Sequence, residues 1–137
     1  MNAQQRLKLM REVAVQADQF YEDAQHFGRT AVQSDLKKHQ LKNLESIADT
    51  ALKVSDVLDH IKTQTGKHKE WRQRNFGSDL LNYIHHQLMS RRNQVCGALN
   101  IPTDRLEAQT VYLYLIRAFL RQLIAQYEYA AVGDQSI

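Results

Sequence analysis

The sequence is poor in residues that interrupt or cross-link a chain. Its 137 residues include one cysteine, one proline, five glycines and one tryptophan. The lone Cys96 excludes an internal disulfide and any zinc or redox site that needs two closely spaced cysteines. The scarcity of glycine, proline and β-branched clusters favours helices joined by short turns.

Long hydrophobic runs are also missing. No apolar stretch approaches the ~18 residues of a membrane span, and the start MNAQQRLKLMREV lacks the apolar centre of a secretory signal. We therefore expect a cytoplasmic protein with no membrane partner. The length fits one domain, residues 1–137, whose core forms without cross-links. Residues 130–137 are expected to be a frayed tail of this domain.

Apolar periodicity predicts an all-α fold, a compact bundle of four or five helices. The first helix is expected to be long, ending before Gly28, with a core-facing stripe made of Leu7, Met10, Ala14, Ala17, Phe20 or Tyr21, Ala24 and Phe27. A second follows the caps Ser34 and Asp35, with an inward face of Leu41, Leu44, Ile47, Ala48 and Ala51. A short third helix starts at Ser55 and Asp56, or the second continues toward Gly66; the pattern leaves both open.

Two more helices are expected in the second half of the chain. Ser78 and Asp79 cap the first of them, and its inward residues are Leu80, Leu81, Ile84, Leu88, Val95 and Leu99. Pro102 ends that helix, and Thr103 with Asp104 caps the last one. The stretch VYLYLIRAFLRQLI is apolar around most of its circumference. The last helix is therefore either central to the bundle or shared with a partner chain.

Six histidines raise the question of a metal site, but their spacing does not support one. His85 and His86 are adjacent and point about 100° apart on a helix, which is unsuitable for one ion. The stretch TQTGK lacks the glycine that a phosphate loop needs five residues before Gly66. No nucleophile elbow or cofactor fingerprint occurs. We predict no enzymatic activity, no metal and no cofactor.

The charge is unevenly distributed along the chain. The total is +3, yet residues 62–92 carry seven Lys or Arg and two acidic residues, a sum of +5. The other segments sum to zero (1–29), −1 (30–61) and −1 (93–137). A local basic excess attracts phosphate backbones through its long-range field and through counterion release. A solvated connection between helices is the plain alternative.

The candidate nucleic-acid contacts come from three places in the chain. They are Lys67, Lys69, Trp71, Arg72 and Arg74 in GKHKEWRQRNFG, then Arg91 and Arg92, and on an earlier helix Lys38 and Lys42 beside Lys37. The cations would hold phosphates with little reading of sequence. Trp71 would stack on a base, or it caps the bundle end together with Phe76.

Two stretches, LKKHQLKNLESIA (36–48) and LIRAFLRQLIAQYEYA (115–130), resemble the helical small subunit of type III CRISPR effector complexes. The resembling elements are Gln40-Leu41-Lys42-Asn43 and Ala125-Gln126-Tyr127. Lys42 stands where the family pattern has arginine. The resemblance implies a non-catalytic subunit that stacks inside a ribonucleoprotein and contacts the backbones of guide and target RNA, with Lys42 as a candidate phosphate contact.

Two functions are therefore carried forward. The first is a structural RNA-binding subunit of a CRISPR-type ribonucleoprotein for antiviral defence, with other subunits of the complex as partners and with self-association left open. The second is a protein-interaction or scaffolding bundle whose apolar last helix docks a partner and whose basic residues serve solubility.

Overall fold

The computed structural model describes residues 1–135, and every regular element in this range is helical. The elements are α1 (Ala3–Gln19), α2 (Tyr21–Gln33), α3 (Lys38–Thr50), α4 (Val54–Lys67), α5 (Lys69–Arg72), α6 (Phe76–Tyr83), α7 (Met89–Leu99) and α8 (Leu106–Gln135). A 3-10 turn (Gln73–Asn75) links α5 to α6, and a π-helical stretch (Ile84–Leu88) makes α6 and α7 one continuous helix.

The all-α prediction is confirmed, but the predicted count of four or five helices is wrong. With α6 and α7 taken as one helix and the single turn α5 set aside, six helices pack together in the described part of the chain. The additional helix arises because the predicted first helix is two. The chain bends at Phe20, where α1 ends and α2 begins.

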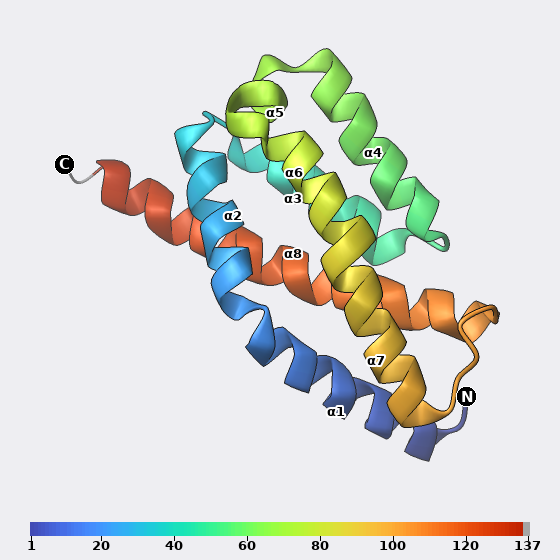
Figure 1. Cartoon of the computed structure of the whole chain (residues 1–137). Coiled ribbons are helices and arrows are strands. Elements are labelled where there is room, and N and C mark those ends of the chain that lie inside the picture. The colour runs from blue at the N-terminus through green and yellow to red at the C-terminus, as the bar shows by residue number, and fades with distance from the viewer. Residues whose placement is uncertain (136–137) are drawn as a thin grey trace.

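Helix α8 runs through the middle of the molecule (Figure 1). It packs against α1, α2, α3, α4 and α7, and its apolar side chains from Val111 to Tyr127 are largely buried. Of the two alternatives for the last helix, the central position is the one found. The expected frayed tail is helical as far as Gln135, and residues 136–137 lie outside the described range. None of the described helices is long and apolar enough to cross a bilayer.

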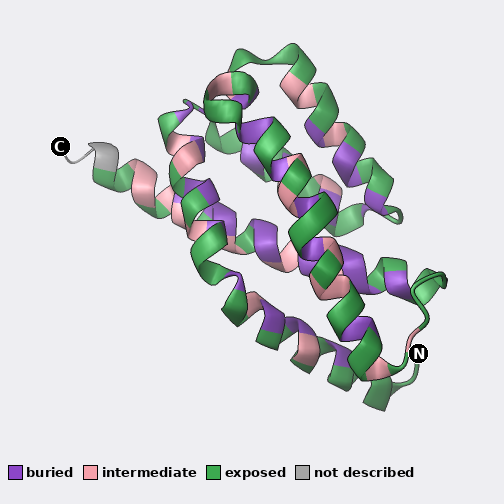
Figure 2. Ribbon diagram, viewed as in Figure 1, coloured by how far each residue is buried: buried purple, intermediate pink, exposed green. Residues whose placement is uncertain are grey.

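The expected core stripe of the first helix is partly wrong in register. Leu9 and Val13 of α1 are buried, at 2% and 6% exposure. Leu7 and Met10, which were expected to face the core, are 53% and 50% exposed. Both sets have helical spacing, so periodicity alone cannot decide which one meets the neighbouring helices. Figure 2 shows the resulting exposed face along much of α1.

The middle of the chain resolves the alternative that the sequence left open. An extended connection separates α3 from α4, so the third helix is separate, and it continues to Lys67. The segment from Gly66 to Gly77, expected to be an exposed connection, is largely helical: it holds the end of α4, α5, the 3-10 turn and the start of α6. The inward residues Leu80, Ile84, Leu88 and Val95 are fully buried as predicted.

The closest backbone approach among the glycines lies where α2 crosses α8, at Gly28. A Cβ at Gly28 would lie 2.6 Å from the Leu123 carbonyl oxygen and 2.9 Å from the Tyr127 amide nitrogen. Both atoms belong to the backbone of α8 and cannot move independently of that helix. Glycine is therefore required here by space between two helices.

We predict that Gly28→Ala destabilises the fold by about 1–3 kcal/mol, the usual effect of overpacking a tight contact. Gly97→Ala is the matched control, because a Cβ there meets open space and alanine favours a helix by up to about 1 kcal/mol. Denaturant unfolding of both variants measures the difference. A Gly28→Ala protein as stable as the wild type would contradict the packing argument.

A second prediction concerns pH and His60 in α4. Burial lowers the pKa of its imidazole below the ordinary 6.5, and Nε2 has no hydrogen-bond partner in the described structure. The unfolded chain therefore binds this proton more tightly than the folded chain does. The corresponding stability is intact above the unfolded pKa and is lost as the pH falls from about 6.5 toward the folded pKa.

Thermal melts between about pH 7 and about pH 5 should show this loss in the wild type and a smaller loss in His60→Gln. His85→Gln, which changes an exposed histidine, should keep the wild-type slope. Equal slopes in all three proteins would show that His60 does not contribute.

Candidate nucleic-acid interface

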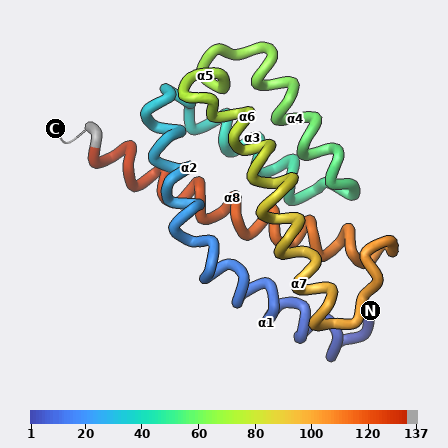
Figure 3. Tube along the Cα trace, viewed as in Figure 1, coloured from blue at the N-terminus to red at the C-terminus, as the bar shows by residue number. Residues whose placement is uncertain are grey.

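Two chain segments that are about 35 residues apart meet at one end of the molecule. Ser34 Oγ, after α2, donates to the Gln73 carbonyl over 3.2 Å, and Arg74 Nε donates to the Gln33 carbonyl over 3.3 Å. The turn between α2 and α3 therefore lies beside α5 and the 3-10 turn, as the trace in Figure 3 shows. We call this region the basic end; its exposed cations are Lys37, Lys38, Lys67, Lys69, Arg72 and Arg74.

A hydrogen bond from α8 holds the turn between α2 and α3. The Tyr127 hydroxyl donates to the Leu36 carbonyl over 2.6 Å in a buried position. Desolvation, followed by the charge of Glu128, raises the pKa of Tyr127. The hydroxyl therefore keeps its proton and remains a donor at neutral pH. This bond fixes the backbone next to Lys37 and Lys38, whose side chains extend into solvent.

The cations of α5 and its flanks are without carboxylate partners in the part of the chain that the structure describes. Lys67, Lys69 and Arg74 are exposed and form no ion pair within residues 1–135. Arg72 Nη1 donates to the carbonyls of Thr65 and Gly66, over 3.0 and 3.1 Å, at the C-terminal end of α4. Arg72 thus satisfies helix-end carbonyls while its charge stays at the surface.

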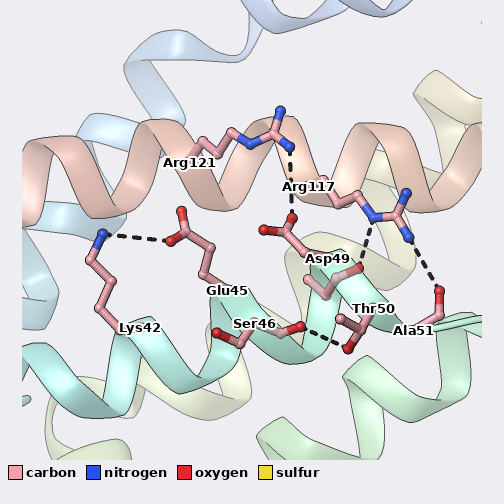
Figure 4. A network of polar contacts seen from close by, with 9 residues as sticks. Lys42, Glu45, Ser46, Asp49, Thr50, Ala51, Arg117 and Arg121 are labelled. Atoms are coloured by element: carbon pink, nitrogen blue, oxygen red, sulfur yellow. Dashed lines mark hydrogen bonds and ion pairs between the residues drawn. The ribbon is translucent and has the colours of Figure 1, made fainter.

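The lysines of α3 are in a different electrostatic situation. Lys38 and Lys42 Nζ lie 3.7 and 3.6 Å from Glu128 Oε1 of α8, and Lys42 also lies 3.5 Å from Glu45. Figure 4 shows the Lys42 and Glu45 side chains facing each other along α3. Two lysines and two glutamates balance to zero charge. In the described structure, the cations of the basic end without an ion pair are therefore Lys37 and those of α5 and its flanks.

Two acids lie within the basic end: Asp35 is exposed in the turn between α2 and α3, and Glu70 belongs to α5. For Glu70, a hydrogen bond from its own backbone is the largest cause that lowers its pKa; desolvation opposes this, and the Gln40 side chain with the charges of His68 and Lys69 adds to the lowering. Glu70 is therefore ionised at neutral pH. The two acids offset part of the positive charge.

The structure decides between the two positions that the sequence left open for Trp71. Its side chain is fully buried and packs edge-to-face against Phe76, with ring centroids 5.6 Å apart. The alternative, in which Trp71 and Phe76 close the end of the bundle, describes the structure. The indole therefore offers no face to a base in this conformation. Trp71 is buried because its large ring is more stable in the core than in water.

Arg91 and Arg92 lie away from the basic end. The continuous helix from Phe76 places Arg91 about 22 Å further along, at ~1.5 Å per residue. Arg91 Nη1 donates to the side chains of Gln16 and Gln19 on α1, over 2.7 and 2.9 Å. Arg92 bonds Asn93, and its guanidinium lies over the Tyr112 ring. Arg91 thus connects α7 to α1 and Arg92 connects it to α8, and neither joins the cations of α5.

The arginines of α8 hold α3 in place. Arg117 Nε and Nη2 donate to the carbonyls of Ala48 and Ala51, over 2.7 and 3.2 Å, and Arg121 lies 3.7 Å from Asp49 (Figure 4). Arg117 therefore caps the last turn of α3. Both arginines are therefore used in contacts inside the molecule.

The sequence reasoning missed the backbone geometry at the centre of the basic end. Arg74 and Asn75 both have positive φ, 53° and 57°, in a left-handed turn that ends α5 and starts α6. Asparagine adopts this conformation often, but arginine seldom does. The Asn-Phe-Gly stretch after two arginines is the signal that the sequence offers for this turn.

Among the described residues, no three His, Cys, Asp or Glu side chains come together in a way that could hold a metal ion. Comparisons of the chain with models of known protein families, with curated proteins and with solved structures found no match.

We predict that Tyr127→Phe lowers the free energy of unfolding by about 1–3 kcal/mol, because the buried Leu36 carbonyl loses its donor. Tyr129→Phe is the matched control, since Tyr129 is 77% exposed, and it should leave stability unchanged. Denaturant unfolding tests both. Equal stability of the two variants would show that the Tyr127 hydroxyl does not hold the turn.

Proposed function

We propose that this chain is a non-catalytic RNA-binding structural subunit of a cytoplasmic CRISPR-type ribonucleoprotein, and that it contacts guide or target backbone through the basic end. The observation that supports this most is the convergence of α5 and the turn between α2 and α3, which gathers cations that lack carboxylate partners. The resemblance in residues 36–48 and 115–130 supports the choice of complex.

The chemistry of the basic end suits phosphate more than bases. Exposed lysines and Arg74 offer point charges and a guanidinium fork, both of which bind phosphate oxygens. The aromatic residues nearby, Trp71 and Phe76, are buried and cannot stack on a base. A surface of this kind binds any sequence, which suits a subunit that must accept every guide.

The test removes three exposed cations of the basic end that have no carboxylate partner within residues 1–135 and keeps Arg72. The variant Lys67→Gln, Lys69→Gln, Arg74→Gln retains Arg72, which caps α4. We expect weaker binding of single-stranded RNA, and a plot of log affinity against log salt that is shallower by up to about 2, from ~0.7 for each lost phosphate contact.

The matched control removes three exposed cations elsewhere: Lys8→Gln, Lys53→Gln, Arg105→Gln. The net charge changes equally, so a general electrostatic effect would weaken both variants alike. The proposal requires that the control binds RNA like the wild type. Equal losses in the two variants, or no RNA binding by the wild type at moderate salt, would reject it. Thermal melts confirm that both are folded.

The second candidate, a protein-docking bundle, is favoured by a different surface from the one first expected. The apolar face of α8 is used inside the molecule. The exposed apolar residues lie mainly on α1 and at the end of α8, where Tyr129 and Val132 are 77% and 64% exposed. A scaffold would therefore use α1, and its binding would be unaffected by charge removal at the basic end.

A further inference from the structure

An apolar strip along α1 lies at the surface. Its members are Ala3, Leu7, Met10, Ala14, Ala17 and, at the junction with α2, Tyr21; all are exposed except Ala17, which is partly buried. We call them the α1 seam. Leu7, Met10 and Tyr21 are 53%, 50% and 48% exposed. The members follow one another at alternating intervals of four and three residues, which is the heptad spacing of helices that pair along one side.

The α1 seam is separate from the face that α1 buries. Leu9, Val13 and Gln16 make the buried stripe, and at about 100° per residue the seam lies about a third of a turn away from it. Gln122 of α8 donates to the Ala17 carbonyl over 3.1 Å at the border of the seam. Beyond this bond lies a pocket of about 440 Å³ against α8, lined by Tyr21, Ala125 and Tyr129 and by the polar side chains of Gln25, Arg121, Gln122 and Gln126.

We propose that the α1 seam pairs with the α1 seam of a second copy of this chain, in antiparallel orientation, to form a two-fold symmetric dimer. The charges beside the seam select this occupant. Arg11 and Asp18 border its solvent side, seven residues apart, and both are exposed with no ion pair in the described structure. Antiparallel pairing places Arg11 opposite Asp18 of the second copy, and symmetry repeats the contact.

Parallel pairing is disfavoured by the same residues. In a parallel pair, residues five apart on opposite borders of the seam come together, so Arg6 would face Arg11 of the second copy. Two such contacts of like charge would form. The antiparallel arrangement replaces this repulsion by two attractive contacts.

The seam residues also fit one another in the register that the charges select. Ala14 lies opposite Ala17 of the second copy at the centre, so the two helix axes can approach to about 8 Å, the lower limit for packed helices. Met10 lies opposite Tyr21 toward each end, where larger side chains fill the wider space. The two-fold axis then passes between the central alanines, as an isologous contact requires.

Self-association through α1 does not depend on the proposed RNA binding. The basic end lies beyond α2, away from the seam (Figure 1). In the antiparallel dimer the two basic ends point in opposite directions. Two copies would therefore contact separate stretches of nucleic acid.

Sedimentation velocity of the full chain, from about 1 µM to about 500 µM, tests the proposal. We expect a monomer–dimer equilibrium in the wild type, and at least about tenfold weaker association in Met10→Gln, Tyr21→Gln, which changes the two larger side chains that face each other in this register. Val15→Gln is the matched control, because Val15 is 50% exposed on the same helix but lies off the seam. Circular dichroism checks that each variant is folded.

Orientation is tested by charge reversal. Arg11→Asp should weaken the dimer by about tenfold if the pair is antiparallel, and Arg11→Asp with Asp18→Arg should restore it. If Arg11→Asp strengthens association, the pair is parallel and the proposed orientation is wrong. A wild type that stays monomeric throughout, or a dimer that Met10→Gln, Tyr21→Gln leaves intact, overturns the proposal whatever the result of the RNA experiment. Binding of α1 to another protein without self-association also counts against it.

Discussion

The structure depends on α8 as a source of hydrogen-bond donors for the backbones around it. Tyr112 donates to the Ile84 carbonyl, Arg117 to Ala48 and Tyr127 to Leu36, each over 2.6–2.7 Å. The carbonyls belong to the start of the π-helical stretch, the end of α3 and the turn after α2. Irregular backbone of this kind is expensive to bury without partners. One helix therefore fixes the places where the chain bends, while Gly28 allows α2 to lie directly against it.

The position of the charged surface follows from these interior contacts. Tyr127 holds the turn after α2, the turn holds α5 through Ser34 and Gln33, and α5 with its flanks carries the free cations. Trp71 belongs to α5 and is buried against Phe76, and this contact also holds α5 in place. The same side chains that complete the core thus decide which cations share a surface. The core packing therefore determines which of the charges that are spread along the sequence lie close together in space.

The sequence was sufficient for the fold class and for most of the core, because an apolar period of 3.6 residues is a local property. It was insufficient where two stripes on one helix compete, as with Leu7 and Leu9, since the choice depends on neighbours from distant parts of the chain. The bend at Phe20 has no glycine or proline to signal it. The separation of Arg91 from Arg74 and the ion pairs of Lys42 with Glu128 are tertiary facts of the same kind. The sequence places the positive charge excess in residues 62–92, but its arrangement in space and its division between free and paired cations needed coordinates.

The left-handed turn at Arg74 bears on why the basic end is built as it is. A non-glycine residue with positive φ is disfavoured by about 1 kcal/mol or more, and two follow one another here. Glycine at position 74 would remove this cost, and the hydrogen bond from Arg74 to Gln33 is exposed, so it compensates only in part. Stability alone therefore gives a weak reason for arginine at this position. A guanidinium held at the surface between α5 and α6 would serve the proposed contact with a phosphate, together with Lys67 and Lys69 of the same basic end. The turn at Arg74 and Asn75 places the Arg74 side chain in the basic end and leads the chain into α6. The proposed contact with nucleic acid would therefore explain why a conformation that costs backbone energy is kept here.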